Sequence, residues 1–164
     1  MKLIVCKDYD KMSEKAALMI AGVIALKPDC TLGLATGSTP VGMYKRLVAM
    51  YDAGELDFSK VTTYNLDEYY PIKPTDHQSY RYFMNDNLFD HVNIDKNNTH
   101  VMDGEAPDPV VECTEYDKAV EKAGIDIQVL GIGRNGHIGF NEPADKLTAE
   151  THLTDLTEST IEAN

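Results

Sequence analysis

The stretch IDIQVLGIGRNGHIGFNEP, residues 125–143, decides which fold the sequence predicts. Its first part, residues 125–132, is apolar, rich in β-branched side chains and alternating, which predicts a buried strand. Its second part brings three glycines and several polar side chains together before a proline. Because open α/β sheets bind ligands beyond the carboxyl ends of their parallel strands, we expect a functional site here. Its candidate residues are Asn135, His137 and Glu142.

Two simpler interpretations of this stretch compete with a site. GIGRNG, residues 131–136, matches the G-x-G-x-x-G pattern of dinucleotide-binding proteins, but that pattern must open a helix and Pro143 follows too soon. The stretch could also be a glycine-rich connector in which His137 only satisfies backbone groups. The density of polar residues favours a site over a connector.

Composition and charge set the class of protein. The chain has 164 residues, of which 43% are hydrophobic, which is typical of one soluble globular domain. Its formal net charge of -12 argues against nucleic acid as a partner, because a phosphate backbone would be repelled. A small phosphorylated ligand remains compatible, since backbone amides can bind one phosphate locally.

Cysteine usage and hydropathy indicate a cytoplasmic protein without a membrane partner. The three cysteines, Cys6, Cys30 and Cys113, show no C-x-x-C spacing, which suits reduced thiols and predicts neither a disulfide framework nor a zinc site. The longest apolar run, residues 16–26, is shorter than the roughly 20 residues that span a bilayer. Charged residues at positions 7, 8 and 10 interrupt the N-terminal apolar run before a signal-peptide core could form.

Strands and helices are predicted to alternate along the chain. The expected strands are residues 2–5, 32–34, 61–65, 125–132 and 151–156. The expected helices are residues 10–26, one from Pro40 with Thr39 as its N-cap, one from Ser79, one from Asp108 to Gly124, and one begun by the capping box of Ser159 and Glu162.

This alternation predicts an α/β fold, namely a doubly wound, mostly parallel sheet with helices on both faces, in a Rossmann-like arrangement. Residues 1–164 are expected to form a single domain. Too few residues follow Ser159 for a stable helix, so we expect this domain to be the N-terminal part of a longer one that lacks its C-terminal elements here.

Three loops should meet at the carboxyl edge of this sheet. They are ATGSTP (residues 35–40), LDEYY (residues 66–70) and GRNGHIGFNEP (residues 133–143). The first resembles an anion cradle, because Gly37 allows close approach, Ser38 and Thr39 offer hydroxyls, and free amides begin the next helix. An ordinary capped helix start would show the same pattern.

Asp67 and Glu68 form a pair of carboxylates at the end of a predicted strand. If one is buried against Tyr69 and Tyr70, its pKa would rise and it could act as a base near neutral pH. The alternative is a solvated turn in an acidic protein. The histidines other than His137 lack metal-ligand spacing, so no metal is predicted.

The three motifs together resemble a known family. LGLATGSTP (residues 32–40), YNLDEY (residues 64–69) and GIGRNGHIGFNEP (residues 131–143) are similar to the glucosamine-6-phosphate deaminase family, also called glucosamine/galactosamine-6-phosphate isomerases. The resemblance implies conversion of glucosamine 6-phosphate and water to fructose 6-phosphate and ammonia, without metal or cofactor. It places the chain among hydrolases of amino-sugar metabolism, in the degradation of N-acetylglucosamine and sialic acid.

The resemblance also assigns roles to residues. Asp67 matches the base that moves a proton from C2 to C1, and His137 matches the group that opens the sugar ring. Glu142 would orient His137, and Asn135 fills the remaining ring-opening position. The loop of Gly37, Ser38 and Thr39 matches the family's phosphate loop.

The resemblance leaves several points open. The family's later phosphate-binding arginine and lysine are expected beyond Asn164. Some members form hexamers with an allosteric site of basic residues, so a homo-oligomer is one option, although residues 145–154 offer only Lys146 and His152. A 6-phosphogluconolactonase-like hydrolase, a non-catalytic sugar-phosphate-binding module and an inactive fragment remain alternatives. Spacing does not separate glucosamine from galactosamine 6-phosphate as the substrate.

Overall fold

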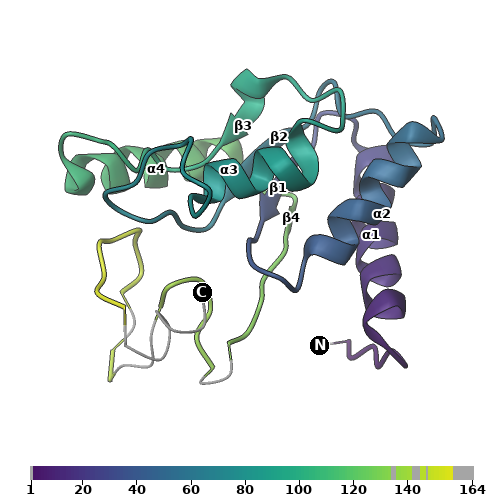
Figure 1. The fold of residues 1–164 in the computed structure, drawn as a ribbon, viewed down its shortest axis with the longest axis horizontal. Helices are drawn as coiled ribbons and strands as arrows, with labels where there is room; N and C mark the ends of the chain where they lie inside the picture. The colour runs from purple at the N-terminus through teal and green to yellow at the C-terminus, as the bar shows by residue number, and fades with distance from the viewer. Residues whose placement is uncertain (1, 134–135, 142–144, 147, 157–164) are drawn as a thin grey trace.

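The computed structural model describes residues 2–133, 136–141, 145–146 and 148–156 (Figure 1). The helices are α1 (Tyr9–Leu26), α2 (Val41–Asp52), α3 (Tyr80–Met84) and α4 (Pro109–Ala123), with a π-helical turn η1 (Asn85–Phe89) and a 3-10 turn η2 (Lys96–Asn98). The strands are β1 (Thr31–Leu34), β2 (Thr62–Asn65), β3 (Thr99–His100) and β4 (Ile127–Gln128). Among the described residues, no helix has both the length and the apolar character needed to cross a bilayer.

The four strands form one parallel sheet in the order β3-β2-β1-β4. Leu32 of β1 pairs with Thr63 on one side and with Ile127 on the other. The chain therefore moves outward from β1 to β3, then crosses back to the far side of β1. The strand order reverses between β1 and β4, and such a switch point is where doubly wound sheets bind ligands.

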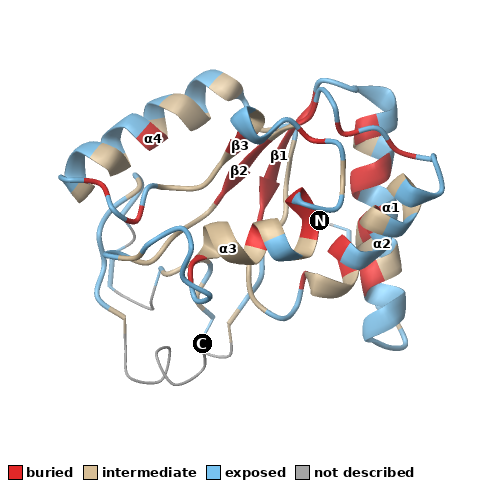
Figure 2. Ribbon diagram, turned by 45° about the horizontal axis from the view of Figure 1, so that its top comes forward, coloured by how far each residue is buried: buried red, intermediate tan, exposed pale blue. Residues whose placement is uncertain are grey.

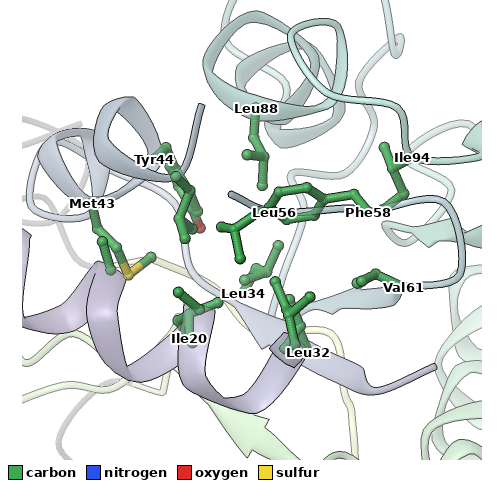
Figure 3. Packing of buried hydrophobic residues seen from close by; sticks show 14 of the residues in the cluster. Ile20, Leu32, Leu34, Met43, Tyr44, Leu56, Phe58, Val61, Leu88 and Ile94 are labelled. Atoms are coloured by element: carbon green, nitrogen blue, oxygen red, sulfur yellow. The ribbon is translucent and has the colours of Figure 1, made fainter. Parts of the chain in front are cut away.

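Helices cover both faces of the sheet, as the sequence predicts. The main core lies between the sheet and the layer of α1, α2 and η1, and its members include Ile20, Leu32, Tyr44 and Leu88 (Figure 3). α4 lies on the opposite face, because a right-handed crossover that runs back along the sheet must use the other side (Figure 2). Its buried residue Tyr116 forms an edge-to-face contact with the Tyr64 ring of β2.

Side-chain caps explain where three of the helices begin. The side chains of Asp8, Ser79 and Asp108 accept backbone N–H groups of the first turns of α1, α3 and α4, respectively. α2 differs: its N-cap is Pro40, which makes no side-chain capping hydrogen bond. The prediction of Thr39 as N-cap and Pro40 as first helical residue is therefore wrong by one position.

Three further predictions need correction. Residues 2–5 form no strand, because no neighbouring strand pairs with them among the described residues and Leu3 and Val5 stay 81% and 85% exposed. The strand predicted at 125–132 is confirmed only at Ile127–Gln128. Residues 151–156 are not a strand, since the Thr151 amide binds the Asp117 carboxylate instead of a ladder partner. The helix predicted from Ser159 lies outside the described residues.

Candidate active site

The first loop joins β1 to α2 and is held from two sides. Tyr44 donates its hydroxyl to the Ala35 carbonyl at 2.6 Å from within the core. Tyr9 donates to the Thr39 carbonyl at 3.0 Å from α1. Gly37 has φ +90°, a left-handed conformation that a larger side chain adopts only with strain. This fixed turn directs the start of α2 toward the edge of the sheet.

The second loop separates the two neighbouring carboxylates. Glu68 accepts the backbone N–H groups of Tyr69 at 2.9 Å, Tyr80 at 2.8 Å and Arg81 at 3.0 Å. Its carboxylate therefore places a negative charge at the start of α3, where the helix dipole favours it. Asp67 makes no such contact, because none of the hydrogen bonds among the described residues reaches its carboxylate.

The environment of Asp67 raises its pKa to about 7. Burial is the larger cause, since it disfavours the charged carboxylate, and the charge of Glu68 adds to it. Burial also raises the pKa of Glu68, but the three backbone N–H groups oppose that rise. Asp67 is thus the carboxylate that can take up and release a proton near neutral pH.

The third loop places His137 by a tight turn. The Gly133 N–H donates to the His137 carbonyl at 2.8 Å, and Gly136 N–H donates to the Gly133 carbonyl at 2.9 Å. A Cβ on Gly133 would lie 2.2 to 2.5 Å from atoms of the imidazole, so only glycine leaves room for this ring. Gly139 has φ +61°, and a Cβ there would lie 3.3 Å from Asp67 Oδ2. The two glycines therefore let the backbone of this loop pack closely against the His137 imidazole and the Asp67 carboxylate.

Three aromatic rings join the second and third loops. Phe140 stacks on Tyr80 with ring centroids 5.6 Å apart and contacts Tyr69 at 5.0 Å. Tyr69 and Tyr80 contact each other at 5.0 Å. Burial, and then the charge of Asp67, raise the pKa of the Tyr80 hydroxyl, so this side chain remains neutral beside the carboxylate. The cluster therefore lies beside the Asp67 carboxylate.

The three loops surround one cavity at the switch point of the sheet. Its volume is about 350 Å³, within the usual range for small-molecule sites. Its lining includes residues 36–40, Asp67, Tyr80, His137 and a wall from α1 with Met12 and Ser13. A second cavity of about 490 Å³ lies along α4 and residues 148–156, and Asp67 lines both. We take the first of these two cavities as the candidate active site, because residues of the first loop and His137 line it and do not line the second.

The structure therefore brings together Gly37, Ser38, Thr39, Asp67 and His137. Asn135 and Glu142 lie outside the described residues. The dinucleotide interpretation fails, because no helix follows Gly136 within residues 136–141. In the described part of the chain, no group of three His, Cys, Asp or Glu residues could hold a metal ion.

Sequence reasoning missed the supporting residues of this cavity. Tyr80 and Phe140 stack on each other and line the cavity with Asp67, a tertiary arrangement that no spacing rule predicts. Tyr9 and Ser13 belong to a helix whose periodicity indicates a role in the core alone. Only the position of Tyr80, directly after the predicted helix start Ser79, was a usable signal.

A parallel sheet, a cavity at its switch point and a desolvated carboxylate in that cavity are the features of an α/β protein with a small-molecule site and a group suited to acid–base chemistry. Residues 8–152 match the family described as glucosamine-6-phosphate isomerases/6-phosphogluconolactonase, and the chain belongs to this family.

Curated relatives agree with this family. Glucosamine-6-phosphate deaminases of Halothermothrix orenii and Clostridium perfringens are 56% and 60% identical to this chain, and each match covers the whole chain and 68% of the relative. The Clostridioides difficile enzyme is 59% identical, with 66% of its length covered. The chain thus spans about two thirds of the length of these relatives.

Solved structures agree with this family assignment. A monomeric glucosamine-6-phosphate deaminase superposes with a TM-score of 0.97 at 44% identity, covering all of this chain and 68% of that one. The 6-phosphogluconolactonase of Plasmodium vivax reaches a TM-score of 0.67 at 29% identity, with 84% of this chain and 50% of that chain covered.

Proposed function

We propose that the protein is a glucosamine-6-phosphate deaminase that converts glucosamine 6-phosphate and water to fructose 6-phosphate and ammonia. One observation carries the proposal: the Asp67 carboxylate, whose pKa is raised to about 7, lines the same cavity as His137 and the first loop. An aldose-to-ketose rearrangement needs a base of this kind, because the C2 proton must be removed and returned at C1.

The first step is ring opening, in which a proton leaves the C1 hydroxyl and another reaches the ring oxygen. An imidazole can accept and donate protons near neutral pH, so we assign this step to His137. Glu142 would orient the imidazole and Asn135 would hydrogen-bond beside it, as the family resemblance implies.

The second step transfers a proton along the open chain. Asp67 removes the C2 proton and returns it to C1, while one N–H proton passes to the C1 oxygen. The product is a ketose that carries an imine at C2. Water then adds to C2 and ammonia leaves, which gives fructose 6-phosphate and conserves all atoms. The step requires Asp67 to be ionised before the proton transfer; with a pKa of about 7 the carboxylate is half ionised near pH 7 and mostly ionised above it.

We assign the phosphate of the substrate to the first loop. Ser38 and Thr39 offer hydroxyls, Gly37 allows close approach, and α2 begins at the loop's end with no side-chain cap of its own. Free amides and the dipole at a helix start favour an anion. Further basic residues of the family's phosphate site are expected beyond Asn164.

Lactone hydrolysis is the alternative activity within the family. The comparisons support the deaminase more strongly, since deaminases match at 44% to 60% identity and the P. vivax lactonase at 29%. Asp67 is a second argument, because a lactonase must activate water and does not need a base held over two carbons.

We further propose that the enzyme acts in the cytoplasm as a hydrolase of amino-sugar catabolism, in the degradation of N-acetylglucosamine and sialic acid. The described cysteines are free thiols, which supports a reducing compartment. Residues 1–164 would form most of a single domain. The 44% identical deaminase is monomeric, so light scattering of this protein decides between a monomer and a homo-oligomer.

The test is ammonia release from glucosamine 6-phosphate by the 164-residue chain and by the protein at its full natural length, each beside Asp67→Asn. Activity that disappears in Asp67→Asn supports the proposal. A folded full-length protein without activity refutes it, and lactone hydrolysis and sugar-phosphate binding without turnover are then measured. Galactosamine 6-phosphate, assayed in parallel, decides the configuration of the substrate.

A further inference from the structure

The phenol of Tyr9, at the first position of α1, contacts the backbone of the first loop in two places and that of α2 in one. Its oxygen accepts the Gly42 N–H at 2.8 Å, and its hydrogen is shared between the carbonyls of Ser38 at 3.1 Å and Thr39 at 3.0 Å. One side chain from a different helix therefore ties the loop to the first turn of α2. Tyr9 itself does not line the cavity, so it holds the loop from behind.

These contacts determine which way the loop presents its amides. In a trans peptide, the carbonyl and the following N–H point in opposite directions. Because the Ser38 carbonyl points toward Tyr9, the Thr39 N–H points away from it. Thr39 lines the cavity and Tyr9 does not, which is consistent with an amide that faces the cavity.

Tyr9 also replaces the missing cap of α2. Pro40 makes no side-chain capping hydrogen bond, so the Gly42 N–H in the first turn takes its partner from the Tyr9 hydroxyl. This contact requires glycine at position 42. A Cβ there would lie 2.8 Å from Tyr9 Cε1 and 2.3 Å from Ser13 Oγ.

A second residue on α1 indicates that a ligand reaches this end of the cavity. Ser13 lies one turn after Tyr9, is only 2% exposed and lines the cavity. Its hydroxyl has no hydrogen-bond partner among the described residues. Buried polar groups are usually paired, so this hydroxyl indicates a hydrogen-bonding group from outside the protein.

We propose that Tyr9 is a positioning residue for phosphate recognition, because its hydroxyl fixes the first loop and the start of α2 in the conformation that presents free amides to a sugar phosphate. This inference rests on the proposed function and deepens it. Tyr9 does not touch the substrate, so its loss should weaken binding of the phosphate and leave the chemistry at Asp67 and His137 intact.

The experiment compares Tyr9→Phe with the wild type at full natural length. Steady-state ammonia release gives KM and kcat, and inorganic phosphate serves as a competitive inhibitor. We expect KM and the inhibition constant of phosphate to rise together by about three- to tenfold, as for one lost hydrogen-bond network, with kcat within about twofold. Tyr51→Phe is the matched control, since it removes a phenol hydroxyl from the end of α2 far from the loop.

A second variant keeps the hydroxyl but displaces the ring. Gly42→Ala should raise both KM and the inhibition constant of phosphate, because the added Cβ pushes the Tyr9 ring away. If Tyr9→Phe does not fold, Gly42→Ala takes its place in the experiment. Unchanged constants in the folded variant, or a lower kcat at unchanged KM, overturn the inference. A wild type that releases no ammonia refutes the proposed function instead. Calorimetric titration with inorganic phosphate then decides: weaker binding by Tyr9→Phe supports the inference, and equal or absent binding overturns it.

Discussion

The starts of α2 and α3 occupy equivalent places in the fold but have different partners. Each follows the carboxyl end of a parallel strand, β1 for α2 and β2 for α3. At α3, the amides of Tyr80 and Arg81 donate to the Glu68 carboxylate, and the amide of Tyr82 donates to the Ser79 hydroxyl. At α2, no side chain caps the helix from Pro40, and only Tyr9 holds an amide of the first turn among the described residues.

The comparison teaches that one electrostatic feature serves two purposes. A helix start attracts negative charge through its free N–H groups and its dipole. In α3 the protein supplies the negative charge itself, and the helix becomes a fixed support for the second loop. In α2 the position is open toward the cavity, where we propose that the ligand phosphate binds. Asp67 lines one cavity together with residues of both helix starts, Pro40 and Tyr80.

The largest expected effect is on kcat and comes from removing the carboxylate of Asp67. Asp67→Asn cannot accept the C2 proton, so kcat for ammonia release should fall by about 10² to 10⁴-fold. Asp103→Asn is the control, because that exposed carboxylate accepts the Glu105 N–H and does not line the cavity that contains His137. Equal activities of wild type and Asp67→Asn would remove Asp67 from the mechanism.

The same variant should be more stable than the wild type above neutral pH. The pKa of Asp67 is about 7 in the folded state against an ordinary value of 3.8 for a solvated aspartate, so the folded protein binds a proton more tightly than the unfolded chain. Stability from this group is fully present below pH 4 and is lost as pH rises toward 7 and beyond. Urea unfolding at pH 8 should therefore show Asp67→Asn stabilised by up to about 4 kcal/mol. No pH-dependent difference would mean that the carboxylate is solvated.

A steric change in the third loop tests whether the cavity before α2 holds the chemistry. Gly133→Ala places a methyl group 2.2 to 2.5 Å from imidazole atoms of His137, so the ring must move. Misplacing a catalytic group by about 1 Å costs on the order of 10²-fold in rate, and we expect a loss of about 10- to 100-fold. Gly22→Ala is the matched control, since no atom lies within 4 Å of its added Cβ and Gly22 does not line the cavity. If both variants kept full activity, His137 would have no role.

These residues also show how far sequence reasoning reaches. The α/β class and the parallel sheet followed from periodicity, because core helices and strands must repeat with fixed spacings. The same rule failed at residues 2–5, since an apolar run does not reveal whether a strand is available to pair with it. The capping rule that predicted Thr39 as N-cap failed as well, because the residue that holds the start of α2, Tyr9, is distant in sequence.

The candidate site was predictable in position but not in detail. The shared edge of parallel strands brings Ser38, Asp67 and His137 to one cavity, as topology predicts. Residue chemistry alone could not distinguish Asp67 from Glu68, because adjacent carboxylates look alike until the backbone amides of α3 are in place, and only the family resemblance pointed to Asp67. The roles of these residues, with those of Asn135 and Glu142, stay predictions.

Removing the negative charge at the start of α3 should have a smaller but measurable effect on stability and on the pH profile. In Glu68→Gln one oxygen can still accept the Tyr69 and Tyr80 amides, but an NH₂ group then faces the Arg81 N–H. We expect a loss of about 1 to 2 kcal/mol in urea unfolding. Because the charge of Glu68 raises the pKa of Asp67, the acid limb of kcat/KM should also move to lower pH. Glu112→Gln, whose carboxylate accepts only the Asp103 N–H among the described residues, should change neither quantity. An unmoved acid limb would show that Glu68 does not act on Asp67.

The smallest effect concerns the open helix start itself. If α2 receives the phosphate, inorganic phosphate at several times its dissociation constant should stabilise the folded protein by about 1 kcal/mol, or roughly 2 to 4 °C in Tm. Phosphate also strengthens burial in general, so the informative quantity is the difference between variants. The double variant Ser38→Ala, Thr39→Ala should gain less than the wild type, because its loop has lost two hydroxyl donors. Glu68→Gln should gain as much as the wild type, since α3 is not a ligand site. An equal gain in all three proteins would mean that the two helix starts differ only in their internal partners.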